Sequence, residues 1–207
     1  MQLPSQALEI AAVTLRDYDR VAAEYWTWTK DQDLAADYDW FLSFLRGTGP
    51  FDLLDLGCGP GRDLFQLRQR GHRAVGLDGS LAMVRLARRY TGCPVLHQNF
   101  LALRLRAGRF DGIFASASLF HVPPEALSEV LSHLHTALRA EGILYALNPR
   151  GRGQSGWAGD RYCTYHSLTG WRRLLRATGF RERGCELRPK DSDRSDQRWV
   201  ASIWQKG

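Results

Sequence analysis

From Phe51 to the C-terminus, short apolar runs alternate with helical patterns, and this alternation is the feature that most restricts the fold. Strands are predicted at 51–57, 72–78, 93–99, 110–116, 142–148, 181–187 and 199–205. Helices are predicted at 61–70, 80–90, 123–140 and 167–179. Such alternation is typical of a parallel sheet with helices on its faces. The predicted fold class is therefore α/β: a single Rossmann-like, doubly wound domain with a mostly parallel seven-stranded sheet flanked by helices.

The regions outside this core have their own patterns. Residues 1–49 are expected to form a helical region, with helices at 5–15 and 33–46 on either side of the aromatic segment YDRVAAEYWTWTK. Residues 148–166 show no strand or helix pattern, and a loop of that length in a compact domain is more often functional than incidental. Residues 167–207 supply the last helix and the last two strands. Helix ends are predicted at Gly71, Gly142 and Gly179.

Composition excludes several classes of protein. With 44% hydrophobic and 24% charged residues, the 207-residue chain is expected to be globular rather than disordered, collagenous or a coiled coil. No apolar run approaches the roughly 20 residues that span a bilayer, and no basic region precedes an apolar stretch at the start. We therefore expect a cytoplasmic protein without a membrane partner. The cysteines lack zinc-site and C-x-x-C spacing, so no metal site or disulfide framework is expected. They are Cys58, Cys93, Cys163 and Cys185.

The positive charge is concentrated near the C-terminus. The net charge is +6, and residues 150–207 hold 13 of the 28 Lys and Arg residues but 6 of the 22 Asp and Glu residues. A basic patch is one signature of a nucleic-acid partner. A solvated arginine-rich face accounts for the same excess and is the preferred interpretation.

A glycine-rich loop follows the first predicted strand. The strand leads into Gly57-Cys58-Gly59-Pro60-Gly61 and then a helix, so that bare backbone can approach a ligand at the helix start. The second strand ends in Asp78, whose carboxylate can accept both hydroxyls of an adenosine ribose. Together these features predict an adenosine-containing cofactor bound within residues 50–147. The alternative for Asp78 is a cap for the helix that begins near Ser80.

Two missing features weaken the case for a nicotinamide cofactor. A dinucleotide fingerprint requires glycine at the sixth position of the loop, where this chain has Arg62. No Tyr is followed four residues later by the Lys that a short-chain dehydrogenase requires. Hydride transfer is therefore the weaker alternative.

At these residues the sequence resembles the class I S-adenosylmethionine-dependent methyltransferases, from about Tyr18 to the last strand. The family's DxGxGxG loop and second-strand acid match Asp55, Gly57, Gly59, Gly61 and Asp78. The resemblance implies that S-adenosyl-L-methionine is the cofactor, with Asp55 and the loop glycines holding its methionine part and Asp78 its ribose. The remaining cofactor contacts that it implies are Tyr18, Tyr25, Trp28, Cys58, Arg62, Gly79, Asn99, Phe100 and Ser116.

The resemblance also implies which residues surround the adenine and which cover the cofactor. Asn99 and Phe100 would flank adenine, although the family often has Asp where Asn99 stands. The aromatic residues before the first strand match the segment that covers the cofactor, with burial in the core as the alternative. They are Tyr18, Tyr25, Trp26 and Trp28.

A narrower resemblance is carried by three segments, EYWTWTKDQDL, ASASLFHVP and NPRGRGQSGWAGDRYCTYHSLTGWRRLL. They are similar to the methyltransferase domain of ovothiol-biosynthesis enzymes, which N-methylates the imidazole of a thiolated histidine. In that family the domain is commonly fused to an iron-dependent sulfoxide synthase, for which this chain has no room. The resemblance thus implies a thiolated histidine as the small-molecule substrate and functional pairing with a separate sulfoxide synthase. The family has Asn where Ser116 stands, which is a departure in or near the methyl-transfer site.

Residues that bind the acceptor are expected after the fourth and fifth strands, at the edge where α/β sheets bind ligands. The candidates are Ser116, His121, Asn148, Arg150, Trp157, Tyr162, Tyr165 and His166. Those considered for catalysis are Asn148, His121 and Tyr165. Methyl transfer to a neutral imidazole nitrogen needs positioning more than a strong base.

A carboxylate on the acceptor would pair with Arg150, Arg152 or Arg161. Each candidate also has a structural alternative. His121 would only cap or pack beside Pro123, and the tyrosines would anchor the loop to the sheet.

Three other functions stay open at this point: a methyltransferase of another small metabolite, a nucleic-acid methyltransferase, and a non-catalytic S-adenosylmethionine-binding partner. The nucleic-acid function is weakened because no [DNS]-P-P-[YFW] motif and no Pro-Cys nucleophile follow the fourth strand. The polar segment at 148–166 argues against a non-catalytic role.

Overall fold

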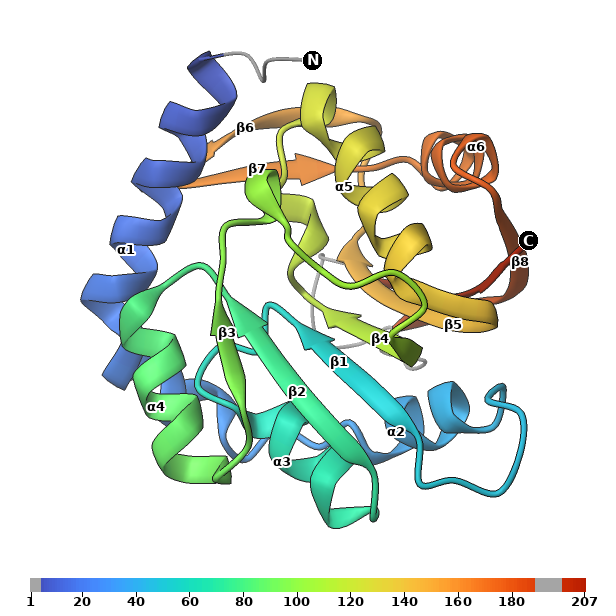
Figure 1. Ribbon diagram of the computed structural model, residues 1–207. Coiled ribbons are helices and arrows are strands. Elements are labelled where there is room, and N and C mark those ends of the chain that lie inside the picture. The colour runs from blue at the N-terminus through green and yellow to red at the C-terminus, as the bar shows by residue number, and fades with distance from the viewer. Residues whose placement is uncertain (1–4, 189–198) are drawn as a thin grey trace.

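A seven-stranded sheet forms the centre of the computed structural model, which describes residues 5–188 and 199–207 (Figure 1). The strand order is β3-β2-β1-β4-β5-β9-β8. All neighbours from β3 to β5 pair in parallel, whereas β9 is antiparallel to both β5 and β8. The predicted fold class is confirmed. The strands are β1 (Asp52–Leu56), β2 (Arg73–Asp78), β3 (Val95–His97), β4 (Phe110–Ser116), β5 (Leu138–Pro149), β8 (Phe180–Arg188) and β9 (Trp199–Lys206).

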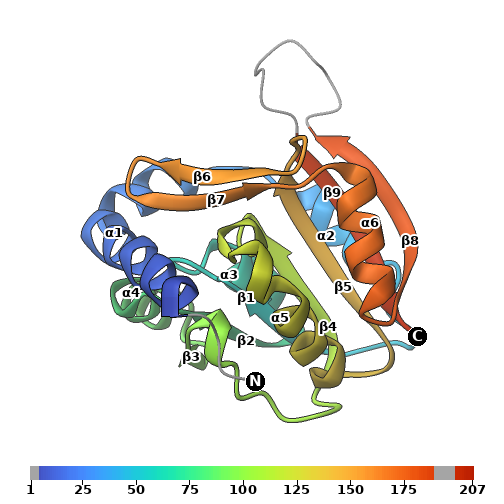
Figure 2. The ribbon, with the colours of Figure 1, turned by 90° about the horizontal axis from the view of Figure 1, so that it is seen from above.

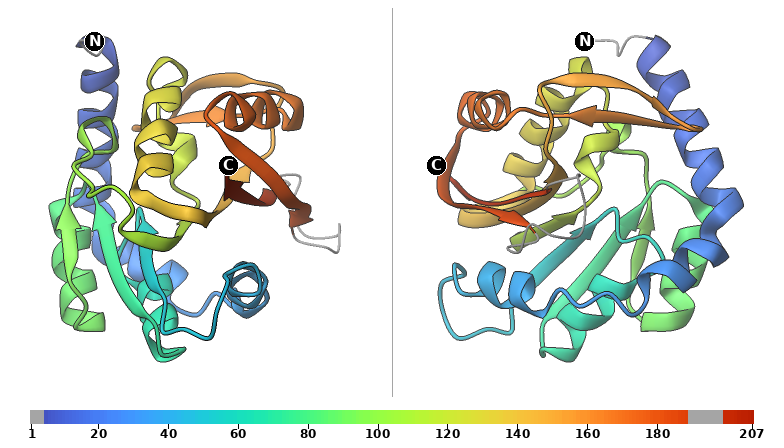
Figure 3. Two further views of the ribbon diagram at one scale, coloured as in Figure 1. Left: turned by 45° about the vertical axis from the view of Figure 1, so that its right-hand side comes forward. Right: turned by 180° about the vertical axis from the view of Figure 1, so that it is seen from behind.

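Helices cover both faces of the sheet (Figures 1 and 3). One apolar cluster joins α2 (Ala35–Leu42), α3 (Arg62–Gln69) and α4 (Leu81–Thr91) to one face. The other cluster joins α5 (Pro124–Ala137) and α6 (Leu168–Ala177) to the opposite face. All five residues of β1 are buried between these two layers, including the acids Asp52 and Asp55.

The N-terminal region differs from the prediction. Helix α1 (Ser5–Thr29) is one continuous helix of 25 residues, so it includes the aromatic segment that was expected to separate two helices. Buried residues recur at helical spacing along it, from Ala7 to Val21, and no glycine or proline interrupts the pattern. Among the described residues, no helix is both long enough and apolar enough to cross a membrane.

The junction between α5 and β5 was also predicted incorrectly. The helix ends at Ala137 and the strand begins at once, so Gly142 lies inside β5 rather than at a helix end. Glu141 adopts a positive φ of 61°, and the pairing of β4 with β5 shifts register nearby. Gly71 and Gly179, with φ of 85° and 89°, do follow α3 and α6 as predicted.

The segment at 148–166 is a β-hairpin rather than an irregular loop. Strands β6 (Gln154–Ala158) and β7 (Arg161–Tyr165) pair with each other in a separate two-stranded sheet. Gly159, with φ of 61°, and Asp160 form the two-residue turn between them, which is a common hairpin sequence. Figure 2 shows this hairpin reaching from the α6 side of the molecule to α1.

Candidate functional site

A cavity of about 670 Å³ lies where the parallel strands end, between the glycine loop and α1. Its volume is in the range of small-molecule and cofactor sites. The cavity brings together residues from regions far apart in the sequence. The predicted site residues that line it are Tyr18, Tyr25, Trp28, Gly57, Cys58, Gly59, Arg62, Asp78, Gly79, Asn99, Phe100, Ser116 and His121.

Two glycines of the loop have different structural roles. Gly59 has φ of 51° and lines the cavity, and a Cβ added there would meet no atom closer than Tyr25 Cε1 at 3.8 Å. Gly61 has φ of 101°, and its added Cβ would lie 2.8 Å from Thr91 Cγ2 on α4. Gly61 is not among the residues that line the cavity, and the absence of a side chain there allows α3 and α4 to pack closely.

Asp78 presents a carboxylate to the cavity from the end of β2. Its oxygens accept hydrogen bonds from the backbone nitrogens of Gly59 at 2.9 Å and Ser80 at 2.8 Å. Burial raises the pKa of Asp78 to about 6, although these backbone hydrogen bonds oppose the shift. The N-cap of α4 is Ser80, whose hydroxyl accepts from Met83 N, so the side chain of Asp78 is not needed for that cap.

Asp55 lies beneath the loop rather than in the lining. It is 1% exposed, and its Oδ2 has no hydrogen-bond partner among the described residues. Burial and the neighbouring Asp63 raise its pKa well above the ordinary value, which favours the protonated carboxyl. The matching acid of the motif is thus buried and does not line the cavity.

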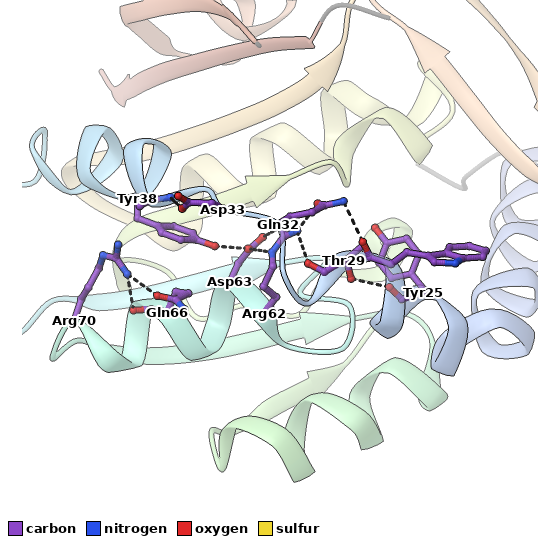
Figure 4. A network of polar contacts seen from close by, with 11 residues as sticks. Tyr25, Thr29, Gln32, Asp33, Tyr38, Arg62, Asp63, Gln66 and Arg70 are labelled. Atoms are coloured by element: carbon purple, nitrogen blue, oxygen red, sulfur yellow. Dashed lines mark hydrogen bonds and ion pairs between the residues drawn. The ribbon is translucent and has the colours of Figure 1, made fainter. Parts of the chain in front are cut away.

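Arg62 connects the loop to the covering helix (Figure 4). Its guanidinium donates to Asp63 Oδ1 at 2.6 Å, to Gln32 Oε1 at 2.6 Å and to the carbonyl of Thr29 at 3.3 Å. Tyr38 donates to the same carboxylate oxygen of Asp63 at 2.6 Å. This network fixes the end of α1 against the start of α3, which accounts for an arginine where a dinucleotide site has glycine.

Helix α1 is also fastened to α4. Asp19 Oδ1 accepts hydrogen bonds from Ser80 Oγ at 2.6 Å and Ala82 N at 2.9 Å. Trp26 packs against Tyr90 of α4 with ring centroids 4.5 Å apart, so it does not line the cavity. Trp28 does line it and is 63% exposed.

The segments after β3 and β4 complete the cofactor side. Asn99 Oδ1 accepts from Leu101 N at 2.9 Å and caps the short 3₁₀ helix η1 (Phe100–Ala102). The amide nitrogen of Asn99 is then the group left to donate toward the cavity. His121 ends a second 3₁₀ helix, η2 (Leu119–His121), and its Nε2 lies 2.7 Å from the Tyr18 hydroxyl.

The hairpin residues are not brought into the cavity. Trp157 and Tyr162 line a separate shallow pocket beside Ile10 and Val13 of α1. Arg161 pairs with Asp17 instead of facing a ligand. The remaining predicted substrate residues outside the cavity lining are Asn148, Arg150, Tyr165 and His166.

Of these residues, Asn148 is buried and His166 is partly buried. Asn148 is 4% exposed, and neither atom of its amide group has a partner among the described residues. His166 packs against Trp171 with ring centroids 5.3 Å apart, and burial lowers its pKa to about 4. The structure gives no support to direct contact between a ligand in the cavity and these side chains.

The sequence missed the far end of the cavity, which is lined by Asp33, Asp37, Arg188 and Trp199. Asp37 Oδ1 and Arg188 Nε lie 3.1 Å apart, although 151 positions separate the two residues. No sequence motif contains both residues, so their pairing could not be predicted before the structure placed α2 beside the end of β8.

Among the described residues, the lining carries an excess of negative charge. Its carboxylates belong to Asp33, Asp37, Asp63 and Asp78, and its guanidinium groups belong to Arg62 and Arg188. Both guanidinium groups are already paired, with Asp63 and Asp37. This arrangement favours a cationic or zwitterionic ligand over a polyanion.

Comparison with protein families agrees with this geometry. The family described as "Methyltransferase domain" matches residues 53–142, which include the glycine loop and Asp78. These 90 residues of the chain are thus similar to that methyltransferase family.

Curated methyltransferases are similar to about half of this chain. Trans-aconitate 2-methyltransferase of Enterobacter sp. (strain 638) is 36% identical over 104 residues, which cover 47% of this chain and 39% of that protein. The 2-heptyl-1-hydroxyquinolin-4(1H)-one methyltransferase of Mycobacteroides abscessus is 36% identical over 103 residues, which cover 45% of this chain and 44% of that protein. The chain spans about two fifths to one half of the length of the curated relatives it matches.

Solved structures extend the likeness to the whole chain. The 1,6-didemethyltoxoflavin-N1-methyltransferase of Burkholderia thailandensis, crystallised with 1,6-didemethyltoxoflavin and S-adenosylhomocysteine, has a TM-score of 0.78 at 23% identity. The alignment covers 100% of this chain and 92% of that one. The chain therefore has the fold of the S-adenosylmethionine-dependent methyltransferases.

The match to the methyltransferase family covers one side of the cavity. Gly59, Asp78 and Asn99 lie inside it, on the side of the cavity where a cofactor is expected. Helix α1, Arg188 and Trp199 complete the cavity from outside it. The matched residues therefore form only part of the cavity.

Proposed function

We propose that this chain is a cytoplasmic S-adenosylmethionine-dependent methyltransferase of a small molecule, and that it N-methylates the imidazole ring of 5-thiohistidine in ovothiol biosynthesis. The observation that carries the methyltransferase function is the Asp78 carboxylate at the end of β2. It faces the same cavity as the Gly59 backbone, within the matched methyltransferase domain. A separate sulfoxide synthase would supply the thiolated histidine.

The residues of the cavity fit S-adenosylmethionine. Asp78 can accept the ribose hydroxyls, Phe100 supplies an apolar surface for adenine, and the loop around Gly59 leaves room for the methionine part. The negative lining suits a cationic ligand. When bound there, the cofactor supplies a methyl group on a positively charged sulfur.

The position of helix α1 and the charges of the lining support a small acceptor. Helix α1 covers the cavity and is fixed at several points by Asp19, Arg62 and Tyr18. A net negative lining disfavours a polyanionic acceptor such as a tricarboxylate, whereas a zwitterionic amino acid suits a site with both charges. Asp33 is an acid of the lining for the ammonium group of such an amino acid.

The chain can promote transfer to an imidazole without a strong base. A neutral imidazole nitrogen has a lone pair, and its attack on the methyl group needs alignment and exclusion of water. Tyr18, Ser116 and His121 line the cavity and are the polar groups proposed to orient the ring. Asn148 and Tyr165, considered for catalysis from the sequence, have no such place in the cavity.

The test is an activity screen with mass-spectrometric detection. Purified protein, S-adenosylmethionine and a panel led by 5-thiohistidine are expected to give a product with one added methyl group on a ring nitrogen and a free thiol. Asp78→Ala should abolish product, with a fold check by circular dichroism. An S-methyl product, or activity only on other small metabolites, contradicts the ovothiol assignment. Methylation of a polynucleotide alone contradicts the small-molecule function, and cofactor binding without turnover of any acceptor favours a non-catalytic role.

A further inference from the structure

A chain of hydrogen bonds runs from the hairpin to the covering helix through His121. The Nδ1 atom of His121 lies 2.8 Å from the carbonyl oxygen of Tyr162 on β7, and its Nε2 lies 2.7 Å from the Tyr18 hydroxyl on α1. Tyr18 and His121 both line the cavity. Figure 2 shows why the chain can form, because the end of the hairpin lies beside α1.

The Tyr162 carbonyl determines which atom donates in both hydrogen bonds of His121. A carbonyl oxygen only accepts hydrogen bonds, so the proton of the neutral imidazole must be on Nδ1. Nε2 is then an acceptor, and the Tyr18 hydroxyl must donate its single proton to it. The Cys163 sulfur lies 3.9 Å from Nδ1, a weaker contact that leaves the proton directed at the Tyr162 carbonyl.

The surroundings keep the imidazole neutral. Burial lowers the pKa of His121 to about 4, and the nearby Arg161 guanidinium also disfavours an imidazolium ion. That guanidinium stacks on the Tyr18 ring, 4.4 Å from its centroid, and is held by Asp17. The Tyr18 side chain is thus held in place by Arg161 at its ring face and by His121 at its hydroxyl.

We propose that the Tyr18 oxygen acts only as a hydrogen-bond acceptor toward the cavity and selects a ligand that places an N–H or ammonium group against it. This inference rests on the proposed function for the identity of the ligands. The donor is either the ammonium group in the methionine part of the cofactor or an N–H group of the acceptor. Tyr18 is a specificity-determining residue in both cases, and His121 is the positioning residue that fixes its polarity.

The polarity is tested without turnover by ¹⁵N NMR of the histidine-labelled full-length protein at pH 7. His121 is expected to carry its proton on Nδ1 with Nε2 unprotonated, and its signals are assigned from a His121→Gln sample. A proton on Nε2, or an imidazolium ion, would reverse the Tyr18 hydroxyl and overturn the proposal.

The ligand contact is tested with Tyr18→Phe, which keeps the ring beneath Arg161 and removes the oxygen. If the donor is the cofactor ammonium, affinity for S-adenosylhomocysteine falls about tenfold or more. Affinity for 5′-methylthioadenosine, which lacks the ammonium group, is then unchanged. If the donor belongs to the acceptor, both affinities stay constant and KM for 5-thiohistidine rises about tenfold with a smaller change in kcat.

Tyr90→Phe on α4 is the matched control, because Tyr90 is a tyrosine outside the cavity lining. Unchanged affinities and KM in Tyr18→Phe would overturn the proposal. Failure of the wild-type protein to bind S-adenosylhomocysteine would instead count against the proposed function, while the NMR result would still decide the polarity.

Discussion

Arg161 on β7 and Asp17 on α1 are 144 positions apart in the sequence, yet Arg161 Nε lies 2.6 Å from Asp17 Oδ2. Burial acts to raise the pKa of Asp17, but the hydrogen bonds from Arg161 and Arg20 outweigh it and leave the pKa lowered. The Asp17 side chain is 6% exposed, so the pair is shielded from solvent on that side. This ion pair joins the hairpin to the helix that covers the cavity.

We expect Asp17→Asn to lower the free energy of unfolding by about 1–3 kcal/mol, because the arginine loses a charged partner. Denaturant unfolding measures the loss. A double-mutant cycle with Arg161→Gln should show a coupling energy of at least about 0.5 kcal/mol. Additive effects of the two substitutions would show that the pair contributes nothing to the attachment of α1.

The affinity for S-adenosylmethionine should depend on the ionisation of Asp78. Its pKa is about 6 in the free protein, and the ribose hydroxyls need the carboxylate form. About one carboxyl in ten is ionised at pH 5, so Kd should be about tenfold weaker at pH 5 than at pH 7. Titration calorimetry measures this dependence. Asp78→Asn should bind weakly with a flat profile from pH 5 to 7, and an equally steep profile in that variant would assign the titration to another group.

Gly59→Ala and Gly61→Ala should fail in different ways. At Gly61 the positive φ and the 2.8 Å approach of Thr91 Cγ2 predict a loss of about 2–4 kcal/mol in the free energy of unfolding. Gly59 has free space around it and should lose about 1 kcal/mol, but the new methyl group would enter the cavity and weaken cofactor binding.

Thermal unfolding and cofactor titration of both variants separate the two effects. Thr91→Ser removes the Cγ2 methyl group and should restore part of the stability lost in Gly61→Ala. If Gly61→Ala is stable and defective only in cofactor binding, the packing role assigned to Gly61 is wrong.

Short sequence patterns correctly predicted the strands and helices of the central sheet. Strand β1 was predicted from its leucines, Leu53, Leu54 and Leu56, and Gly59 and Asp78 became candidate cofactor residues because they belong to short motifs. Contacts between residues far apart in the sequence were not predicted. The pair of Asp37 with Arg188 depends on how α2 meets β8, and nothing near either residue in the sequence indicates it.

The hairpin was missed for a different reason. Its turn residues, Gly159 and Asp160, are a local signal, but the glycine and arginine content of residues 148–166 favoured a loop. The result was an expectation that hairpin side chains face the substrate. In the structure Arg161 contacts α1, and Tyr162 contributes its carbonyl oxygen to His121.

His166 should make stability depend on pH in a known direction. Burial lowers its pKa to about 4, whereas the ordinary value is 6.5, so the unfolded chain binds an additional proton between these values. Stability from this group is complete above pH 6.5 and is lost as the pH falls toward 4. The free energy of unfolding of the wild type minus that of His166→Gln should therefore rise by up to about 3 kcal/mol from pH 4 to 6.5.

Taking this difference removes the contributions of other titrating groups, including Asp78, whose raised pKa acts in the opposite direction. The same substitution at exposed His133 of α5 is the matched control for loss of a surface histidine. Denaturant titrations of the three proteins at half-unit pH intervals provide the measurement. A difference that stays constant from pH 4 to 6.5 would mean that His166 is as free to bind a proton in the folded protein as in the unfolded chain.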